Sequence, residues 1–482
     1  MNGTSPKHRR AKAPDVLLIN PNRMKPPVAP LGLELLAHAL QARGITPKTL
    51  DLSFARAPLK EIQLAVKELK PGVIGISVRN LDDCYYASRS FLLNPVKRYV
   101  REIKEITDAP VVAGGVGFSI SPVAALEYIG ADLGIRGDGE SSFPLLVKAL
   151  AEDRDPGSIS GVFTGRPADV ELDQQPLREL DPGRQWFAPE RYFQEGGQGN
   201  IETQRGCNKK CIYCADPLAK GTTVRYRNPE SVAEEMERLS RMGVHTFHLC
   251  DSEFNLTGKH AQAVCRAIIK KGLGPTVAWY TYALPRPMDK DLAGLMARAG
   301  CKGIDFSVDA ANDAMLENLG RDFNTADLYE CASACRKAGL VFMFDLLLGG
   351  PGETDASMKK TVREVKRIGP DCTGVSFGVR LFPGTRLEKQ LKKKGPLQEN
   401  PALHGKTRNN PGLLKPVFYV SEKLGPDPEG YLQKTIGGDR SFFFASRKDV
   451  KTNYNYNDNR PLQRAVKKGA RGAYWNILRQ MR

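Results

Sequence analysis

The sequence lacks any uninterrupted apolar run of the ~20 residues that a membrane-spanning helix requires. Its first segment, Met1 to Ala13, is basic, but no apolar stretch follows it, so the pattern of a secretory signal is missing too. Internal repeats are also absent. We therefore expect a cytoplasmic protein with no membrane partner, and we interpret residues 1–14 as a solvated basic tail.

The sequence also lacks the features of a disulfide-stabilised protein, although its 482 residues include ten cysteines. In a chain of this length without a secretory signal, a few of them are expected to serve metal binding or catalysis. Only Cys207, Cys211 and Cys214 have the spacing of metal ligands. Cys331 and Cys335 lie four residues apart on a predicted helix, and we interpret them as packed thiols because no third ligand is near in sequence.

Acidic residues are under-represented: 54 Asp and Glu stand against 71 Lys and Arg, which gives a net charge of +17. The excess is concentrated between Arg380 and Arg482, which contain 22 basic and 8 acidic residues. Such charge is compatible with a nucleic-acid partner. Since no basic–aromatic RNA-binding motif accompanies it, we do not expect one.

The first third of the chain alternates apolar strands with amphipathic helices, which predicts a parallel, doubly wound α/β sheet over residues 15–150. The order of elements is typical of flavodoxin-like domains, whose ligands bind beyond the carboxyl ends of the strands. The expected strands lie at or near residues 16–20, 49–52, 73–78, 111–113 and 131–135.

A second α/β series follows a connection, residues 151–198, that is rich in Pro, Gly and Asp. Six strand–helix units over residues 199–390 predict a partial TIM-like (β/α)6 barrel with its working face at the carboxyl ends of the strands. Their strands are expected near residues 201–204, 246–250, 277–282, 303–308, 341–348 and 374–380. The remaining residues, 391–482, are interpreted as a small C-terminal cap.

The three closely spaced cysteines follow the first predicted barrel strand as Cys207-xxx-Cys211-xx-Cys214. Thiolates at this spacing can bind three irons of a [4Fe–4S] cluster and leave the fourth iron open. A structural zinc site would need a fourth protein ligand, and none is close in sequence.

This motif is identified as the signature of the radical SAM superfamily, whose members bind a [4Fe–4S] cluster and S-adenosyl-L-methionine (SAM). The resemblance implies that Tyr213 lies near the adenine and that Asp309 contacts the ribose. It also implies that Gly349 and Gly350, in the segment LLGGPGET, lie near the adenosine.

Polar and glycine residues cluster at the predicted strand ends of the first domain, where glycine lets backbone amides approach a ligand closely. The GxGxxG spacing of NAD sites is missing after the first strand. Because the domain directly precedes a radical SAM barrel, it resembles the cobalamin-binding domain of the B12-dependent subgroup. Its DxHxxG motif is missing, so no lower axial ligand for cobalt is evident. The candidate cofactor-binding residues are Asn20, Ser77, Arg79, Gly114, Gly115, Gly117, Ser119, Gly137, Gly139 and Glu140.

Segments spread over almost the whole chain are similar to the tryptophan 2-C-methyltransferase family of thiostrepton-type pathways. This resemblance implies that Arg79 lies under the cobalt face, that Glu253 reaches the open iron, and that Tyr282 contacts an indole and helps to remove its proton. The implied reaction moves a methyl group from SAM, via methylcobalamin, to a carbon of a small aromatic substrate such as C2 of tryptophan. The segments are residues 19–23, 26–27, 77–80, 195–197, 216–222, 251–256, 380–383, 453–459 and 472–475.

The residues leave alternatives open. Arg79 could be a surface ion-pair partner, Glu253 a helix N-terminal acid and Tyr282 a core aromatic. With the same cofactors, a 5′-deoxyadenosyl radical could methylate an sp3 carbon or rearrange a ring. A tRNA-modifying enzyme and a non-catalytic cobalamin carrier are further alternatives. We also expect an external electron donor and a monomeric protein.

Overall fold

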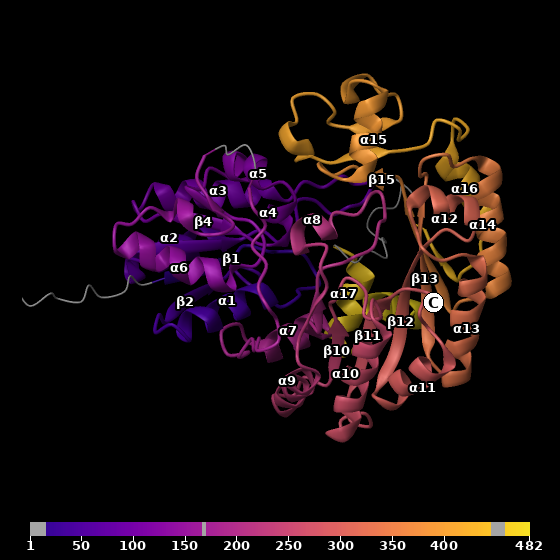
Figure 1. The fold of residues 1–482 in the computed structure, drawn as a ribbon, viewed down its shortest axis with the longest axis horizontal. Coiled ribbons are helices and arrows are strands. Elements are labelled where there is room, and N and C mark those ends of the chain that lie inside the picture. The colour runs from indigo at the N-terminus through magenta and orange to yellow at the C-terminus, as the bar shows by residue number, and fades with distance from the viewer. Residues whose placement is uncertain (1–15, 166–169, 445–457) are drawn as a thin grey trace, which may run out of the picture.

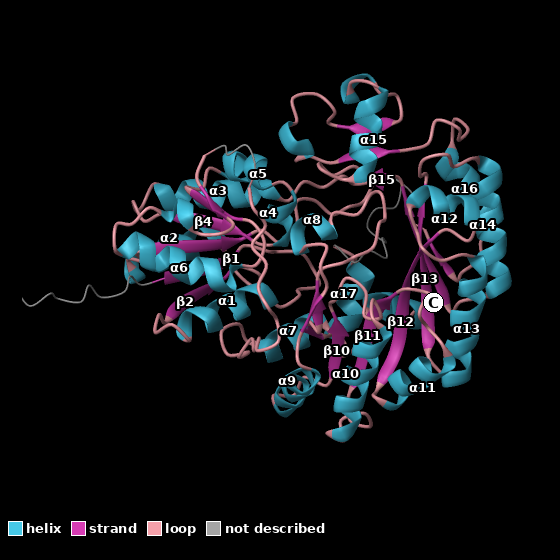
Figure 2. Ribbon diagram, viewed as in Figure 1, coloured by secondary structure: helices cyan, strands magenta, loops and turns pink. Residues whose placement is uncertain are grey.

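The computed structural model describes residues 16–165, 170–444 and 458–482. The predicted basic tail and most of the segment 453–459 lie outside the described residues. Two α/β bodies lie side by side, the N-terminal one on the left of Figure 1 and the larger one on the right, with helices packed around the strands of each (Figure 2). None of the described helices combines the length and apolar character needed to cross a bilayer.

The N-terminal sheet has the strand order β2-β1-β3-β4-β5-β6, parallel except for β6. The order 2-1-3-4-5 is that of flavodoxin-like folds, so this prediction is confirmed. The strands are β1 (Val16–Asn20), β2 (Pro47–Asp51), β3 (Val73–Ser77), β4 (Val111–Gly114), β5 (Leu133–Ile135) and β6 (Val162–Phe163). The helices are α1 (Leu31–Gln41), α2 (Pro58–Leu69), α3 (Leu93–Lys104), α4 (Val116–Ile120), α5 (Pro122–Ile129) and α6 (Gly139–Ala151).

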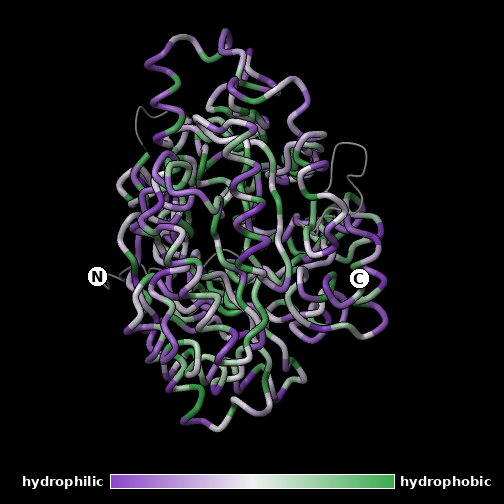
Figure 3. The backbone as a smooth tube through the Cα atoms, turned by 90° about the vertical axis from the view of Figure 1, so that its right-hand side faces the viewer, coloured by the Kyte–Doolittle hydropathy of each residue, from purple (hydrophilic) through white to green (hydrophobic). Residues whose placement is uncertain are grey.

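Strand β1 shows why the strands of this sheet could be predicted from the sequence. All five of its residues are buried, because helices cover both faces of the sheet. Leu17 and Ile19 belong to the core on one face, and Val16 and Leu18 to the core on the other. The apolar segments accordingly run through the interior of both bodies, and hydrophilic segments lie toward the outside (Figure 3).

The larger sheet has the order β18-β14-β13-β12-β11-β10-β7, and all its strand pairs are parallel. It is an open sheet with β7 and β18 at its edges, which agrees with the predicted partial barrel. The strands are β7 (Gly199–Ile201), β10 (Thr246–Leu249), β11 (Ala278–Ala283), β12 (Cys301–Asp309), β13 (Val341–Leu348), β14 (Cys372–Phe377) and β18 (Phe442–Phe443). The helices are α9 (Pro229–Arg241), α10 (Gly258–Lys270), α11 (Lys290–Arg298), α12 (Asp313–Leu319), α13 (Thr325–Ala338) and α14 (Asp355–Ile368).

Smaller elements join and cover the two bodies. Strand β6 comes from the predicted connection and β18 from the predicted cap, so both segments contribute to the main sheets; the domain boundaries themselves stay predictions. Two small antiparallel sheets contain β15 (Val379–Arg380), β17 (Val417–Tyr419) and β16 (Leu403–Gly405), and β8 (Gln204–Arg205) and β9 (Arg225–Tyr226). The remaining helices are α7 (Pro189–Gly196), α8 (Asp216–Lys220), α15 (Arg386–Lys394), α16 (Pro428–Ile436), α17 (Arg460–Lys467), α18 (Tyr474–Gln480) and the short 3-10 turns η1 (Pro156–Ser158), η2 (Leu397–Glu399) and η3 (Pro411–Leu413).

The C-terminal helix α18 packs against the larger sheet (Figure 1), and the last residue, Arg482, donates a hydrogen bond at 2.9 Å to the Phe442 carbonyl of β18. Trp475 of this helix contacts Tyr280 of β11 edge to face, and Asn476 Nδ2 donates a hydrogen bond to the Tyr280 hydroxyl at 3.1 Å. A Cβ atom on Gly303 of β12 would lie 3.0 Å from the Trp475 ring. Helix α18 therefore covers the inner face of the sheet at the end opposite the working face.

Candidate active site

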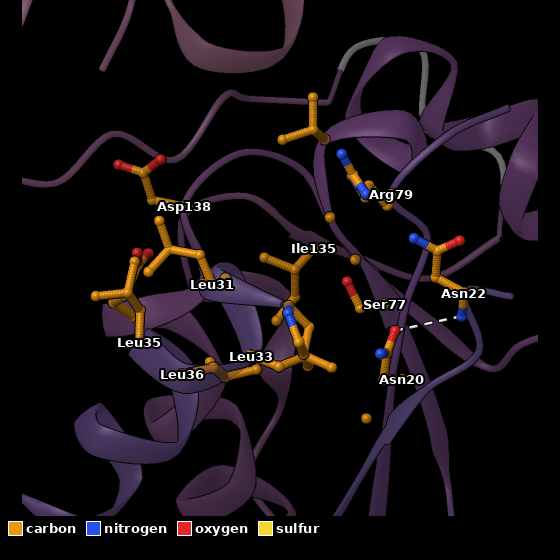
Figure 4. Close-up of a pocket in the computed structure, with 18 of the residues that line it drawn as sticks. Asn20, Asn22, Leu31, Leu33, Leu35, Leu36, Ser77, Arg79, Ile135 and Asp138 are labelled. Carbon is orange, nitrogen blue, oxygen red and sulfur yellow. Dashed lines mark hydrogen bonds between the residues drawn. The ribbon is translucent and has the colours of Figure 1, made fainter. Parts of the chain in front are cut away.

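A cavity of about 400 Å³ opens at the carboxyl ends of β1, β3, β4 and β5, and residues of the larger body complete its wall. We call it the sheet-edge cavity. Figure 4 shows Asn20, Ser77 and Arg79 on one side and Leu31, Leu35 and Leu36 on the other. Of the predicted cofactor-binding residues, it is lined by Asn20, Ser77, Arg79, Gly114, Gly115, Gly137, Gly139 and Glu140. Gly117 and Ser119 are not among its lining residues.

The glycines of the turn after β4 are needed for close backbone packing. Gly115 has φ +104°, and a Cβ atom there would lie 2.7 Å from the Val78 carbonyl oxygen. A Cβ on Gly117 would meet the backbone of Arg79 at 2.8 Å. Ser119 supports the turn from behind: its hydroxyl donates to the Gly115 carbonyl at 3.0 Å and accepts from the backbone N–H of Gly137 at 2.9 Å. Gly117 and Ser119 therefore shape the cavity without lining it.

Asn20 and Arg79 both lie at the rim of the sheet-edge cavity, but they differ in their polar contacts. The buried Asn20 amide donates to Asp51, Ser53 and the Tyr192 hydroxyl, and its Oδ1 accepts from the Asn22 backbone, which is the bond drawn in Figure 4. Asn20 thus holds the loop after β1 in place. Arg79 is half-buried, and in the described part of the chain its guanidinium has no ion pair, so the surface ion-pair alternative finds no support.

Buried charges join the two bodies at the edge of this cavity. Arg205 Nη1 lies 2.7 Å from Asp138 Oδ1 and 3.0 Å from Glu140 Oε1, and both acids belong to the N-terminal body. Arg205 Nη2 lies 2.8 Å from Glu202. Arg225 also pairs with Asp138. Burial opposes ionisation here, but Arg205 and Arg225 together lower the pKa of Asp138 below its usual value. Glu140, predicted as a cofactor contact, is therefore also an anchor between the bodies.

A second cavity, of about 280 Å³, contains the three predicted metal ligands, and we call it the cysteine cavity. Cys207, Cys211 and Cys214 line it together with Tyr213, Glu253 and Asp309; Gly349 and Gly350 do not. Burial raises the pKa of the Cys207 thiol to about 11, and that of Cys211 and Cys214 above the usual value. Binding metal at these thiols would therefore release protons.

Asp309 is aimed into the cysteine cavity by an irregularity at the end of β12. The register with β13 shifts between Ser307 and Asp309, and Asp309 has φ +64°, in the left-handed region. Its Oδ2 accepts a hydrogen bond from the Tyr213 hydroxyl at 2.6 Å and lies 3.4 Å from Arg321 Nε. Arg321 also donates to Cys211 Sγ at 3.0 Å. Tyr213 and Asp309, predicted to contact the adenosine, thus lie side by side.

Glu253 faces this cavity with an unsatisfied oxygen. Its side chain is 8% exposed, and Oε2 has no hydrogen-bond partner among the described residues. Burial raises the pKa of Glu253 to about 8, with Arg321 acting in the opposite direction. A buried carboxylate oxygen without a partner is unfavourable, so a cation in the cavity would stabilise it. The residues fit a [4Fe–4S] cluster: three thiols and a carboxylate with one unsatisfied oxygen share one cavity.

A chain of polar side chains connects the two cavities. Lys220 lines the sheet-edge cavity, whereas Asp216 and Ser252 line the cysteine cavity. Lys220 Nζ donates to Asp216 Oδ2 at 2.9 Å and to Ser252 Oγ at 3.3 Å. At this point the two cavities are therefore separated only by the hydrogen-bonded side chains of Lys220, Asp216 and Ser252.

Comparisons with known proteins agree with this arrangement. The model of the B12 binding domain matches residues 22–147, and that of the radical SAM superfamily matches residues 201–365. Tryptophan 2-C-methyltransferase of Streptomyces laurentii is 32% identical over 448 residues, which cover 79% of this chain and 74% of the relative. The chain belongs to the cobalamin-dependent radical SAM methyltransferases. Its cofactors are a [4Fe–4S] cluster, SAM and cobalamin, as predicted.

Solved structures with the same fold superpose on most of the chain. TsrM from Kitasatospora setae, determined with tryptophan substrate and the SAM analog aza-SAM bound, matches with a TM-score of 0.89 and 29% identity over 97% of both chains. The cobalamin-dependent radical enzyme OxsB matches with a TM-score of 0.69 and 14% identity over 89% of this chain and 67% of its own, and it shares the fold.

Tyr282, the third predicted catalytic residue, lies near Glu253, because its backbone carbonyl accepts a hydrogen bond at 2.9 Å from the N–H of Phe254, the next residue in the chain. It is on β11 and 39% exposed, and its ring packs against His248 of β10 at a centroid distance of 4.9 Å. It lines neither the sheet-edge cavity nor the cysteine cavity. Burial lowers the pKa of His248 to about 4, so this neighbour is a neutral ring at physiological pH. The catalytic role of Tyr282 stays a prediction.

Sequence reasoning missed several residues of this methyltransferase site. Lys220 and Ser252 fall inside segments that carry the family resemblance, and Arg205 lies two residues before Cys207, but their role depends on partners elsewhere in the chain. Arg321 lies in no recognised motif, and nothing in the sequence marks it as a partner of Cys211 and Asp309.

Proposed function

We propose that this enzyme transfers a methyl group from SAM, by way of cobalamin, to C2 of tryptophan or of a closely related indole. The proposal is supported by the names of the relatives: a tryptophan 2-C-methyltransferase at 32% identity and a solved TsrM structure with tryptophan substrate at 29% identity. Bound cobalamin would carry the methyl group between donor and acceptor.

The observation that carries the proposal is the shared wall between the two cavities. Methyl transfer by way of a second cofactor requires that donor, carrier and acceptor carbon lie close together and nearly in line. Lys220 on one side and Asp216 and Ser252 on the other form this wall through direct hydrogen bonds. The Arg205 ion pairs hold the two bodies together beside it.

Three side chains have proposed roles in positioning and catalysis. Arg79, at the rim of the sheet-edge cavity, would place a positive charge against bound cobalamin and would discourage other groups from binding its cobalt. Glu253 would bind the open iron through its unpaired Oε2. Tyr282 would help to accept the proton that leaves the indole, since its exposed ring is accessible to a substrate on the inner face of β11.

The test is anaerobic reconstitution with iron, sulfide and cobalamin, followed by incubation with methyl-labelled SAM and tryptophan. We expect label at indole C2 and one S-adenosylhomocysteine per methyl transferred. Stoichiometric 5′-deoxyadenosine would instead support the radical alternative, and S-adenosylhomocysteine without methylated tryptophan would reject this substrate.

We also propose that the enzyme acts as a cytoplasmic monomer with an external electron donor. The ten free cysteines favour a reducing compartment. A reduced cobalt or cluster requires electrons from outside the protein. Light scattering of the reconstituted enzyme should give a mass near the 53.1 kDa of one chain.

A further inference from the structure

Two acidic residues, Asp305 of β12 and Asp345 of β13, lie on the inner face of the larger sheet. Side chains alternate between the two faces of a strand. On β12, Ile304 and Phe306 pack in the core beneath the outer helices, whereas Ser307 lines the cysteine cavity. Asp305 therefore points inward, between Ser307 and the end of the strand that α18 covers.

Asp345 shares this inner face. It lines the cysteine cavity, and its backbone is in register with Ser307, so it lies diagonally next to Asp305 on the neighbouring strand. The even-numbered neighbour Phe344 packs outward in the core. Asp305 is not among the lining residues, so the two carboxyl groups form one acidic patch that begins at Asp345 in the cavity wall and continues to Asp305 directly behind it.

Asp305 is an unsatisfied acid. Its side chain is 3% exposed, and Oδ1 has no hydrogen-bond partner among the described residues. Burial, then the nearby carboxyl groups of Asp345 and Glu253, raise the pKa of Asp305 well above its usual value. A buried oxygen without a donor is destabilising, and proteins seldom keep one unless a ligand supplies the missing partner.

We propose that Asp305, together with Asp345, binds the ammonium group of the amino-acid substrate. An ammonium group carries one positive charge and three N–H donors, so it can satisfy Oδ1 of Asp305 and offset the charge of both acids. This inference rests on the proposed function, because it assigns one end of the same substrate. The contact between the ammonium group and the two acids would orient the substrate with its amino end toward Asp305. The indole ring would then lie closer to the wall shared with the sheet-edge cavity.

The test compares three ligands that differ at the ammonium group: tryptophan, tryptamine and 3-indolepropionate. Their dissociation constants are measured by calorimetry on holoenzyme containing cluster and cobalamin, for the wild type and for Asp305→Asn. A charge-assisted hydrogen bond corresponds to roughly a 10- to 100-fold change in affinity. We expect Asp305→Asn to weaken tryptophan and tryptamine by at least about tenfold and 3-indolepropionate by less than about twofold.

Melting temperatures and one control variant, Asp251→Asn, separate binding from folding. Asp305→Asn should keep or raise the melting temperature, because the amide resembles the protonated acid that the empty site favours. Asp251 is equally buried, but its carboxylate accepts bonds from Thr203 and Gln204. Asp251→Asn should therefore lower the melting temperature without changing the ratio of the affinities for tryptophan and 3-indolepropionate. Asp345→Asn should reduce that ratio, as Asp305→Asn does.

SAM carries an ammonium group as well, so its affinity is measured in parallel. We expect Asp305→Asn to change the affinity for SAM by less than about twofold, because the proposed site does not bind the ammonium group of SAM. A loss confined to SAM would overturn the inference, as would equal losses for tryptophan and 3-indolepropionate or the absence of any loss. If tryptophan is methylated but its affinity does not depend on Asp305, only this inference fails. If the wild type binds none of the three indoles, the inference fails, and the labelling experiment decides separately on the proposed function.

Discussion

The two cavities use opposite means to hold a cofactor. In the sheet-edge cavity, glycines bring the backbone close to the ligand, and the charged residues Asp138, Glu140 and Arg205 satisfy one another. In the cysteine cavity, the carboxyl groups of Glu253 and, next to it, Asp305 have oxygens without partners among the described residues.

The difference follows from what each cavity binds. A large cofactor that contacts the protein over much of its surface is recognised by its shape, so backbone geometry contributes more to its binding than net charge does. A cavity for iron and a cationic substrate gains affinity from negative groups that stay unsatisfied until the ligand arrives. We therefore expect added volume to impair ligand binding in the sheet-edge cavity and loss of negative charge to impair it in the cysteine cavity.

Loss of a thiolate should have the largest effect and should separate the two cavities. Cys207→Ala removes one of three cluster ligands, so we expect no cluster absorbance and no methyl transfer. Cobalamin binding, measured by its visible spectrum after gel filtration, should stay within about twofold of the wild type, a difference of less than ~0.5 kcal/mol. Loss of both cofactors together would show that the cavities are not independent.

Removing the buried cation that joins the bodies should be the next largest effect. Arg205→Met leaves Glu140 and Glu202 without their ion pair, and breaking a buried pair costs ~3–5 kcal/mol. Urea denaturation should report a loss of about 3 kcal/mol. The matched control is Arg101→Met, whose exposed pair with Glu105 is worth less than ~1 kcal/mol. Equal losses would mean that the Arg205 ion pairs do not stabilise the contact between the bodies.

Added volume in the sheet-edge cavity should weaken cobalamin and spare the cluster. Gly115→Ala places a Cβ 2.7 Å from the Val78 carbonyl, and such overpacking costs ~1–3 kcal/mol, or roughly tenfold in cobalamin affinity. Gly130→Ala is the control, because Gly130 also has positive φ (+77°) but no atom within 4 Å of the new Cβ. If both variants lose cobalamin equally, backbone strain and not volume is responsible.

The smallest effect concerns the charge of Glu253 in cluster-free protein. Burial raises its folded-state pKa to about 8 from an ordinary 4.5, so the folded protein keeps a proton that the unfolded chain releases between those values. Its contribution to stability therefore falls as the pH rises through this window. We expect Glu253→Gln to remove more than ~1 kcal/mol of the decrease in unfolding free energy between pH 5.5 and 8.5. If the wild type and Glu253→Gln show the same pH dependence, then burial does not raise the pKa of the Glu253 carboxyl group in the folded protein.

Much of the fold was predictable because buried parallel strands appear in the sequence as apolar runs. Residues 341–348 were predicted as a strand and form β13 with the same bounds. Strand β18 is two residues long and lies far along the chain from its partner β14, so no local pattern identifies it. For the site, Asp345 interrupts the apolar run VFMFDLLL, and a lone acid within a buried strand is the local signal that marks it.

The cluster motif and the order of the two domains can be inferred from local pattern, because a few cysteine spacings and successive apolar runs encode them, and the family follows from the resemblance of longer segments. Which charges are paired becomes visible only in the folded chain. Arg205 finds its partner Glu140, 65 positions away, whereas Glu253 and Asp305 keep oxygens without partners among the described residues. Pairing depends on distances in space between residues far apart in the chain, and on whether water can reach them, neither of which is encoded by local spacing.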